Sequence, residues 1–164
     1  MKKIVKAVLV SGGLLTVASS ASAQGVVGQN QPPDQWVMNC NTERGRDCTV
    51  SAMIDGGPDN LLGTFLIVSY SAAYTTLTVV VDGNGQRASM QVDNNPFVST
   101  DICTGGACSF VQGKSEALVQ QMLTGQSILV QASTQDDNMA GPLNQSLKGF
   151  ADQYRRAVQA QQGR

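Results

Sequence analysis

The sequence predicts a mainly β protein: an antiparallel β-sandwich or open barrel with a short inserted helix and a C-terminal helix, tied by two local disulfides. Short runs rich in β-branched and apolar residues alternate with turn clusters of Gly, Asn, Asp and Pro, as strands do. Four cysteines lie in two close pairs, Cys40 with Cys48 and Cys103 with Cys108. The N-terminus has the features of an export signal, and exported cysteine pairs become disulfides.

The predicted signal peptide covers residues 1–23. Three lysines among the first six residues precede an apolar stretch over Val8–Val17, and Ala21-Ser22-Ala23 offers the small-x-small cleavage pattern. The apolar stretch is shorter than the roughly 20 residues of a spanning helix. We therefore expect a mature chain that begins at Gln24 and is periplasmic, outer-membrane associated or secreted.

Removal of residues 1–23 makes the chain acidic. Three of the 11 basic residues and none of the 12 acidic ones lie in that segment, so the mature chain carries 8 basic against 12 acidic residues, a net charge of −4. Without a Lys/Arg cluster, it is a poor candidate for binding nucleic acid or an anionic membrane. We expect no membrane span after signal removal, and the sequence leaves the oligomeric state open.

Residues 24–33 resemble a flexible leader, since they lack periodicity and end in two prolines; residues 34–164 suit a single domain. Its first predicted element is a β-hairpin. Trp36-Val37-Met38 leads into Cys40, and Cys48 opens a strand with apolar residues on alternate positions up to Ile54. Three pairings of the four cysteines are possible. Proximity favours Cys40 with Cys48 and Cys103 with Cys108.

Three further strands are predicted over Leu61–Tyr70, Leu77–Val81 and Arg87–Asp93, with a hairpin turn at Asp82–Gly85. Asn94-Asn95-Pro96 ends the third strand, and Phe97–Cys103 can continue as an edge strand.

The remaining chain mixes helix and strand. Ser115 is the predicted N-cap of a helix over 116–123 that Gly125 ends, and residues 127–132 return to strand before a polar loop over 134–138. The final helix is predicted over Gly149–Gln161, with Gly149 allowing close packing at its entry and Arg155-Arg156 pairing with the helix C-terminus.

The ordered series of these motifs resembles the invasion-associated locus B family. The motifs are Asp34–Cys40, the strand after Cys48, Cys103-Thr-Gly-Gly-Ala-Cys108, the Leu118–Gly125 helix with its following strand, and Leu147-Lys-Gly-Phe-Ala151. The resemblance implies a small exported β-sandwich domain at the Gram-negative cell envelope, in envelope function or host-cell invasion. It supplies no catalytic residues.

The sequence does not support several kinds of catalytic, redox and metal-binding chemistry. The chain has no histidine, which removes Ser-His-Asp and Cys-His catalysis and most zinc or copper sites. The cysteine spacing matches no standard zinc motif, and a Cys-x-x-Cys redox motif is absent. Oxygen-rich segments at Asp82–Gln86 and Asp136–Asn138 are interpreted as a hairpin turn and a solvated loop rather than cation sites. We therefore predict no catalytic, cofactor or metal site.

Aromatic residues are interpreted as core rather than as a ligand-binding stripe; they are Trp36, Phe65, Phe97, Phe110 and Phe150. The leading hypothesis is a non-enzymatic envelope protein whose partner is an unidentified envelope or host-surface protein, contacted through strand edges or the loops bearing the cysteine pairs. A periplasmic enzyme or redox helper using carboxylates or a labile disulfide, and a small-ligand-binding protein, stay open as alternatives.

Overall fold

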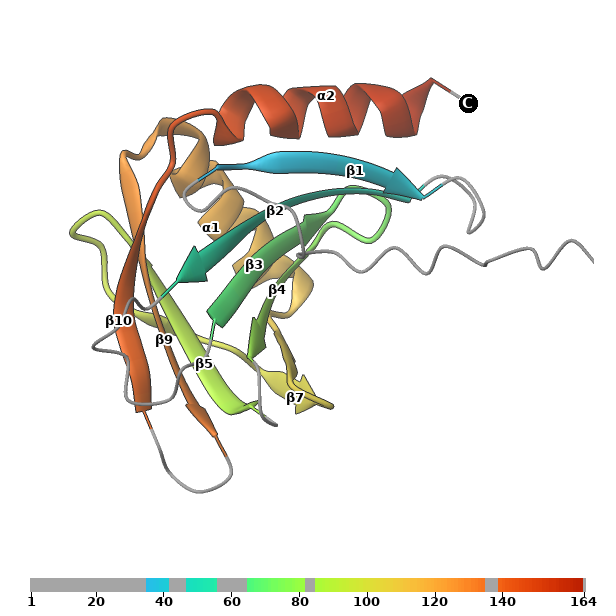
Figure 1. Ribbon diagram of the computed structural model, residues 1–164. Coiled ribbons are helices and arrows are strands. Elements are labelled where there is room, and N and C mark those ends of the chain that lie inside the picture. The colour runs from blue at the N-terminus through green and yellow to red at the C-terminus, as the bar shows by residue number, and fades with distance from the viewer. Residues whose placement is uncertain (1–34, 42–46, 56–64, 82–84, 135–138, 164) are drawn as a thin grey trace, which may run out of the picture.

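The computed structural model describes residues 35–41, 47–55, 65–81, 85–134 and 139–163. These form two antiparallel β-sheets and two helices (Figure 1), so the predicted fold class is confirmed. The predicted signal peptide and leader, the turn at 82–84 and the loop at 135–138 lie outside the described residues.

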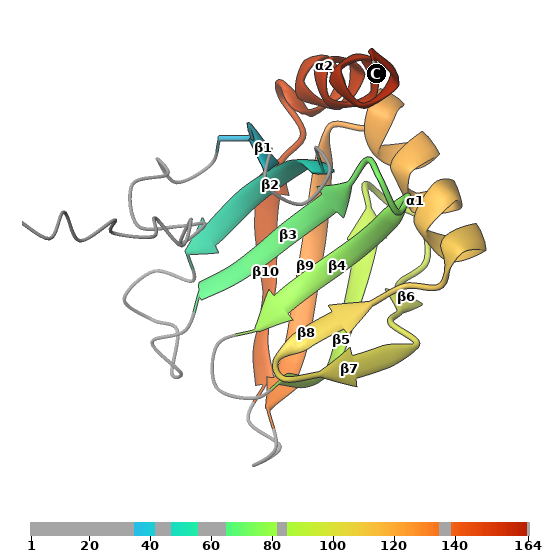
Figure 2. The same ribbon diagram turned by 90° about the vertical axis from the view of Figure 1, so that its right-hand side faces the viewer.

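The larger sheet has six strands in the order β1-β2-β3-β4-β8-β7, laid out side by side in Figure 2. They are β1 (Val37–Asn41), β2 (Asp47–Asp55), β3 (Phe65–Ser71), β4 (Thr76–Val81), β8 (Ala107–Ser109) and β7 (Ile102–Thr104). The burial of β4 alternates along the whole strand, as expected for a sheet with one face on the core.

The smaller sheet has four strands in the order β10-β9-β5-β6. They are β10 (Met139–Ser146), β9 (Ser127–Thr134), β5 (Gly85–Val92) and β6 (Val98–Ser99). Strand β10 was not predicted, because Gly141-Pro142 lies within it and proline interrupts a ladder of backbone hydrogen bonds. The strand accommodates the pair at a register shift between Ala140 and Leu143, which is where sheets tolerate proline.

Helix α1 (Gln112–Thr124) begins earlier than predicted, and Ser115 is not its N-cap. Val111 holds the cap position, and Ser115 is fully buried inside the first turn. The Ser115 hydroxyl accepts a hydrogen bond from the Leu77 N–H (3.1 Å) and donates to the Phe110 carbonyl (3.1 Å). The side chain therefore ties the helix to β4 instead of capping it. Gly125 ends the helix as predicted, and its N–H bonds to the Gln121 carbonyl.

Helix α2 (Phe150–Gln162) also departs from the prediction at its entry. Gly149 is the N-cap with φ 88°, and no atom lies within 4 Å of where its Cβ would be, so the left-handed backbone rather than close packing requires glycine there. Arg155 and Arg156 lie mid-helix, and the last turn has no basic residue. Arg155 instead donates to Asp152 at 2.6 Å, so the predicted C-terminal charge pairing is wrong.

The core lies between the two sheets, where α2 packs against β1 and β2 and α1 packs against β4 and β5. Trp36 and Phe150 complete this core beneath α2, and their rings meet edge to face with centroids 4.8 Å apart. Trp36, Phe110 and Phe150 are buried, as predicted for the aromatic core. Phe65 and Phe97 are each 41% exposed, so the prediction was wrong for these two.

The two sheets approach each other at both sides, which gives the sandwich the character of an open barrel. On one side, the Trp36 indole N–H donates to the Ser146 carbonyl of β10 at 2.7 Å. On the other side, Thr100 lies between β6 and β7 and bonds to Ala88 of β5. Within the described part of the chain, neither helix is long and apolar enough to cross a bilayer.

Candidate functional site

The two disulfides lock opposite edges of the six-stranded sheet. Cys40–Cys48 joins β1 to β2, and Cys103–Cys108 joins β7 to β8. In each case the two cysteines are direct cross-strand partners, with Cα atoms 4.0 Å apart. Both predicted pairings are thus confirmed. The short loops they close correspond to about 2 to 2.5 kcal/mol each in the chain-entropy model.

Each disulfide has one buried and one partly exposed cysteine. Cys48 and Cys108 have 0% exposure, whereas Cys40 and Cys103 are half-buried. An attacking thiolate can approach only the partly exposed cysteine of each pair.

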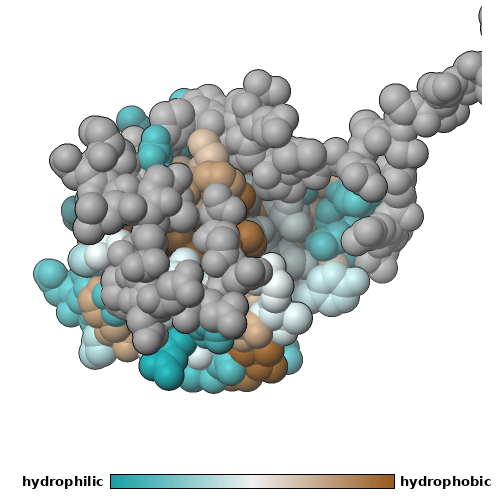
Figure 3. Space-filling view, turned by 60° about the horizontal axis from the view of Figure 1, so that its bottom comes forward, coloured by the Kyte–Doolittle hydropathy of each residue, from teal (hydrophilic) through white to brown (hydrophobic). Residues whose placement is uncertain are grey.

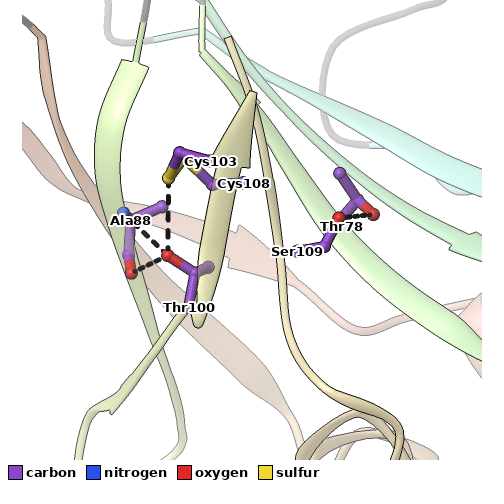
Figure 4. Close-up of a disulfide and its surroundings, with 6 residues drawn as sticks. All are labelled: Thr78, Ala88, Thr100, Cys103, Cys108 and Ser109. Atoms are coloured by element: carbon purple, nitrogen blue, oxygen red, sulfur yellow. Dashed lines mark hydrogen bonds between the residues drawn. A yellow bond between two sulfur atoms is a disulfide. The ribbon is translucent and has the colours of Figure 1, made fainter. Parts of the chain in front are cut away.

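The Thr100 hydroxyl beside Cys103 directs its hydrogen bonds to Ala88 (Figure 4). The Thr100 hydroxyl oxygen lies 3.8 Å from the Cys103 sulfur. A hydroxyl has one proton, and that of Thr100 goes to the Ala88 carbonyl at 3.0 Å, while its oxygen accepts from the Ala88 N–H at 3.2 Å. Since Thr100 has no proton left for Cys103, it provides no stabilisation of a thiolate leaving group.

A groove of about 620 Å³ lies beside this disulfide. One wall is the free edge of β5 beyond Ala88, because β6 pairs with only Ser89 and Met90 of that strand. The segment from Ser99 to Cys103 forms the opposite wall as it crosses from one sheet to the other. The groove therefore occupies the junction at which the two sheets stop short of pairing.

Polar side chains from three strands share one face of the smaller sheet and line this groove; they are Arg87, Ser89, Ser99, Gln131 and Ser133. Ser89 is directly opposite both Ser99 on β6 and Gln131 on β9, and Arg87 is opposite Ser133. These side chains can donate and accept hydrogen bonds, and Arg87 adds a positive charge.

A second charged group of the groove, Asp101, is already neutralised. Lys114 donates to its carboxylate at 2.6 Å, and the Val111 N–H donates to the other oxygen at 2.8 Å. The hydrogen bond from Lys114, followed by that from Val111, lowers the pKa of Asp101 below its ordinary value. Asp101 therefore stays ionised and paired near neutral pH.

Other described carboxylates also have structural partners. Asp93 accepts from the Gln126 and Ser127 N–H groups, and Asp47 accepts from the Ser71 hydroxyl. Glu116 accepts from Gln112 on the same helix. Within the described residues, no group of three or more His, Cys, Asp or Glu side chains is placed to hold a metal ion. Turn, cap and ion-pair contacts account for the positions of these acids.

One buried tyrosine has an altered acidity. Tyr70 is 4% exposed, and its ring stacks obliquely on that of Tyr154 with centroids 5.2 Å apart. Burial, and next the neighbouring Tyr154, raises the pKa of Tyr70 above its ordinary value. The pair joins β3 to α2 within the core, so it serves packing rather than a surface site.

Large apolar side chains reach the surface at a few places. The most exposed are Tyr74 (71%), Ile102 (64%) and Val111 (48%). Figure 3, which brings forward the lower end of the molecule in Figure 1, shows hydrophobic residues in several separate areas between hydrophilic ones. Ile102 and Val111 flank Asp101, whose N–H and carboxylate bond to Ser109 and Val111. Both exposed side chains therefore belong to neighbours of Asp101, Ile102 on the edge strand β7 and Val111 at the start of α1.

The groove was not predicted from the sequence. Among its lining residues, Cys103 was identified there as a disulfide cysteine, and Gln86 was placed at the end of a segment interpreted as a hairpin turn. The alternation of Arg87, Ser89 and Gln91 does indicate a polar strand face. That this face meets Ser99 and Gln131 depends on strand pairing, which the sequence does not reveal.

Comparisons with known proteins identify no relative of this chain. No family model, no curated protein and no solved structure matches this chain. The resemblance to the invasion-associated locus B family therefore remains a hypothesis that rests on the motifs alone.

Proposed function

We propose that this chain is an exported, non-enzymatic cell-envelope protein of the invasion-associated locus B type, which acts by contact with an envelope or host-surface protein. The two disulfides support the exported location, since such bonds persist in oxidising compartments. Periplasm, outer-membrane surface and medium all fit this proposal.

The observation that carries the contact mechanism is the exposure of two apolar residues next to Asp101, Ile102 and Val111. Ile102 is 64% exposed, so its side chain contributes little hydrophobic stabilisation to the isolated domain. Its burial against a partner would instead stabilise a complex. The Cys103–Cys108 disulfide holds Ile102 on a three-residue edge strand, so little ordering entropy is lost on binding.

Site-specific photocrosslinking in intact cells tests this surface. A photoreactive residue at Ile102 should give one saturable adduct, and the same residue at Arg156, exposed on α2, should not give it. A probe placed at Val111 should also give the adduct. Adding Ile102→Asp to that variant should remove the adduct, and the domain should stay folded because Ile102 is exposed. Identical adducts at Ile102 and Arg156, or none at Ile102, would contradict the mechanism.

Thiol titration separates this proposal from the redox alternative. With structural disulfides, the native protein should show no reactive thiol, and mild thiol should leave both bonds intact. Selective reduction of Cys103–Cys108 at equilibrium would instead support redox activity.

A further inference from the structure

The groove beside Cys103–Cys108 has the volume and the fixed walls of a ligand-binding site. Its volume of about 620 Å³ is within the range of pockets that hold small molecules. Its walls are fixed by covalent and hydrogen bonds, because the disulfide holds β7 to β8 and three hydrogen bonds join Thr100 to Ala88. A preformed pocket needs little reorganisation on binding.

A β-bulge directs an extra side chain towards this pocket. The register of β5 against β9 shifts between Gly85 and Arg87, and both Gln86 and Arg87 are exposed as a result. In a regular strand, consecutive side chains would point to opposite faces. Bulges commonly redirect side chains beside functional sites, and here both residues line the groove.

The groove carries one uncompensated positive charge among the described residues. Lys114 neutralises Asp101, whereas no described ion pair involves Arg87. A guanidinium presents paired N–H donors that match the two oxygens of a carboxylate. The groove is thus suited to an anion that approaches Arg87.

The other polar side chains that line the groove favour a ligand with hydroxyl groups. Ser99, Ser89 and Gln131 form a row across β6, β5 and β9, and Ser133 lies beside Arg87. Hydroxyl and amide groups both donate and accept, as a polyhydroxylated ligand requires. None of the described lining residues is aromatic, so the groove offers no stacking surface for an aromatic ligand.

We infer that this groove binds a small polyhydroxylated carboxylate of the sugar-acid class, with its carboxylate on Arg87 and its hydroxyls along the Ser99–Ser89–Gln131 row. This activity is separate from the proposed protein contact at Ile102 and does not depend on it.

The test is an NMR titration of the oxidised full chain with gluconate, using sorbitol as a neutral match with a hydroxymethyl in place of the carboxylate. Gluconate should shift the amide signals of 86–89, 99–101 and 131–133 with saturation, and sorbitol at the same concentration should not. Arg87→Gln should weaken gluconate binding at least tenfold. Arg156→Gln, an exposed arginine on α2, should leave the affinity unchanged and is the matched control.

Three results would overturn the inference: no saturable shift with gluconate, equal shifts with sorbitol, or equal affinity in Arg87→Gln. Because Arg87 is exposed, the variant should keep the spectrum of the parent outside the groove, which verifies its fold.

Discussion

Phe150 is the residue on which the packing of α2 depends most. It is 0% exposed, meets the Trp36 ring at 4.8 Å and 66°, and has the Tyr154 ring 6.0 Å away. Replacing a buried phenylalanine by alanine costs about 3 to 5 kcal/mol, of which the aromatic pair contributes roughly 1 kcal/mol. We expect Phe150→Ala to lower the free energy of unfolding by about 4 kcal/mol.

Urea unfolding measures this change by far-UV circular dichroism and by the fluorescence of Trp36, the single tryptophan. Phe97→Ala is the matched control, because Phe97 is 41% exposed and should cost about 1 kcal/mol or less. Phe150→Leu, expected to cost about 1.5 kcal/mol, serves if the alanine variant does not fold. Equal losses for Phe150→Ala and Phe97→Ala would refute the assignment of Phe150 to the core and Phe97 to the surface.

Three further predictions concern the disulfide, a tyrosine and a serine. Alanine at both Cys103 and Cys108 should lower the free energy of unfolding by about 2 kcal/mol in urea, and an unchanged midpoint would contradict this. Because the pKa of Tyr70 is raised in the folded state, its stabilisation is complete below pH 10 and declines above it, by at most about 1.4 kcal/mol per pH unit, as the unfolded chain ionises. Tyr70→Phe should flatten this alkaline decline and exposed Tyr74→Phe should not; equal declines would exclude Tyr70 as the cause. Ser115→Ala leaves a buried β4 amide and a carbonyl without their partner, so it should cost about 2 kcal/mol in urea unfolding, whereas a loss below about 0.5 kcal/mol would exclude this bridging role.

Local chemistry made most of the fold predictable. The β-branched run at Leu77–Val81 and the alternation after Cys48 identify strands, because side-chain period and turn residues are local properties. The short cysteine spacings likewise indicated both disulfides.

Non-local pairing made the rest unpredictable. The residues at 65–68 are all apolar, so alternation cannot tell that Phe65 faces outward and Leu66 inward. Ser115 has the sequence features of a cap, but its hydroxyl bonds to Leu77, 38 residues away. The groove forms because Ser89 lies opposite Gln131, and this arrangement depends on the pairing of β5 with β9.

The central proposal is that this chain is exported and is held by two structural disulfides. The most direct test is the intact mass of the protein recovered from cells under non-reducing conditions and after treatment with a thiol-blocking reagent. The account predicts a chain that begins at Gln24, about 4 Da lighter than its fully reduced form, with no blocked thiol. A chain that keeps residues 1–23, or one with thiols that accept the reagent, would contradict it.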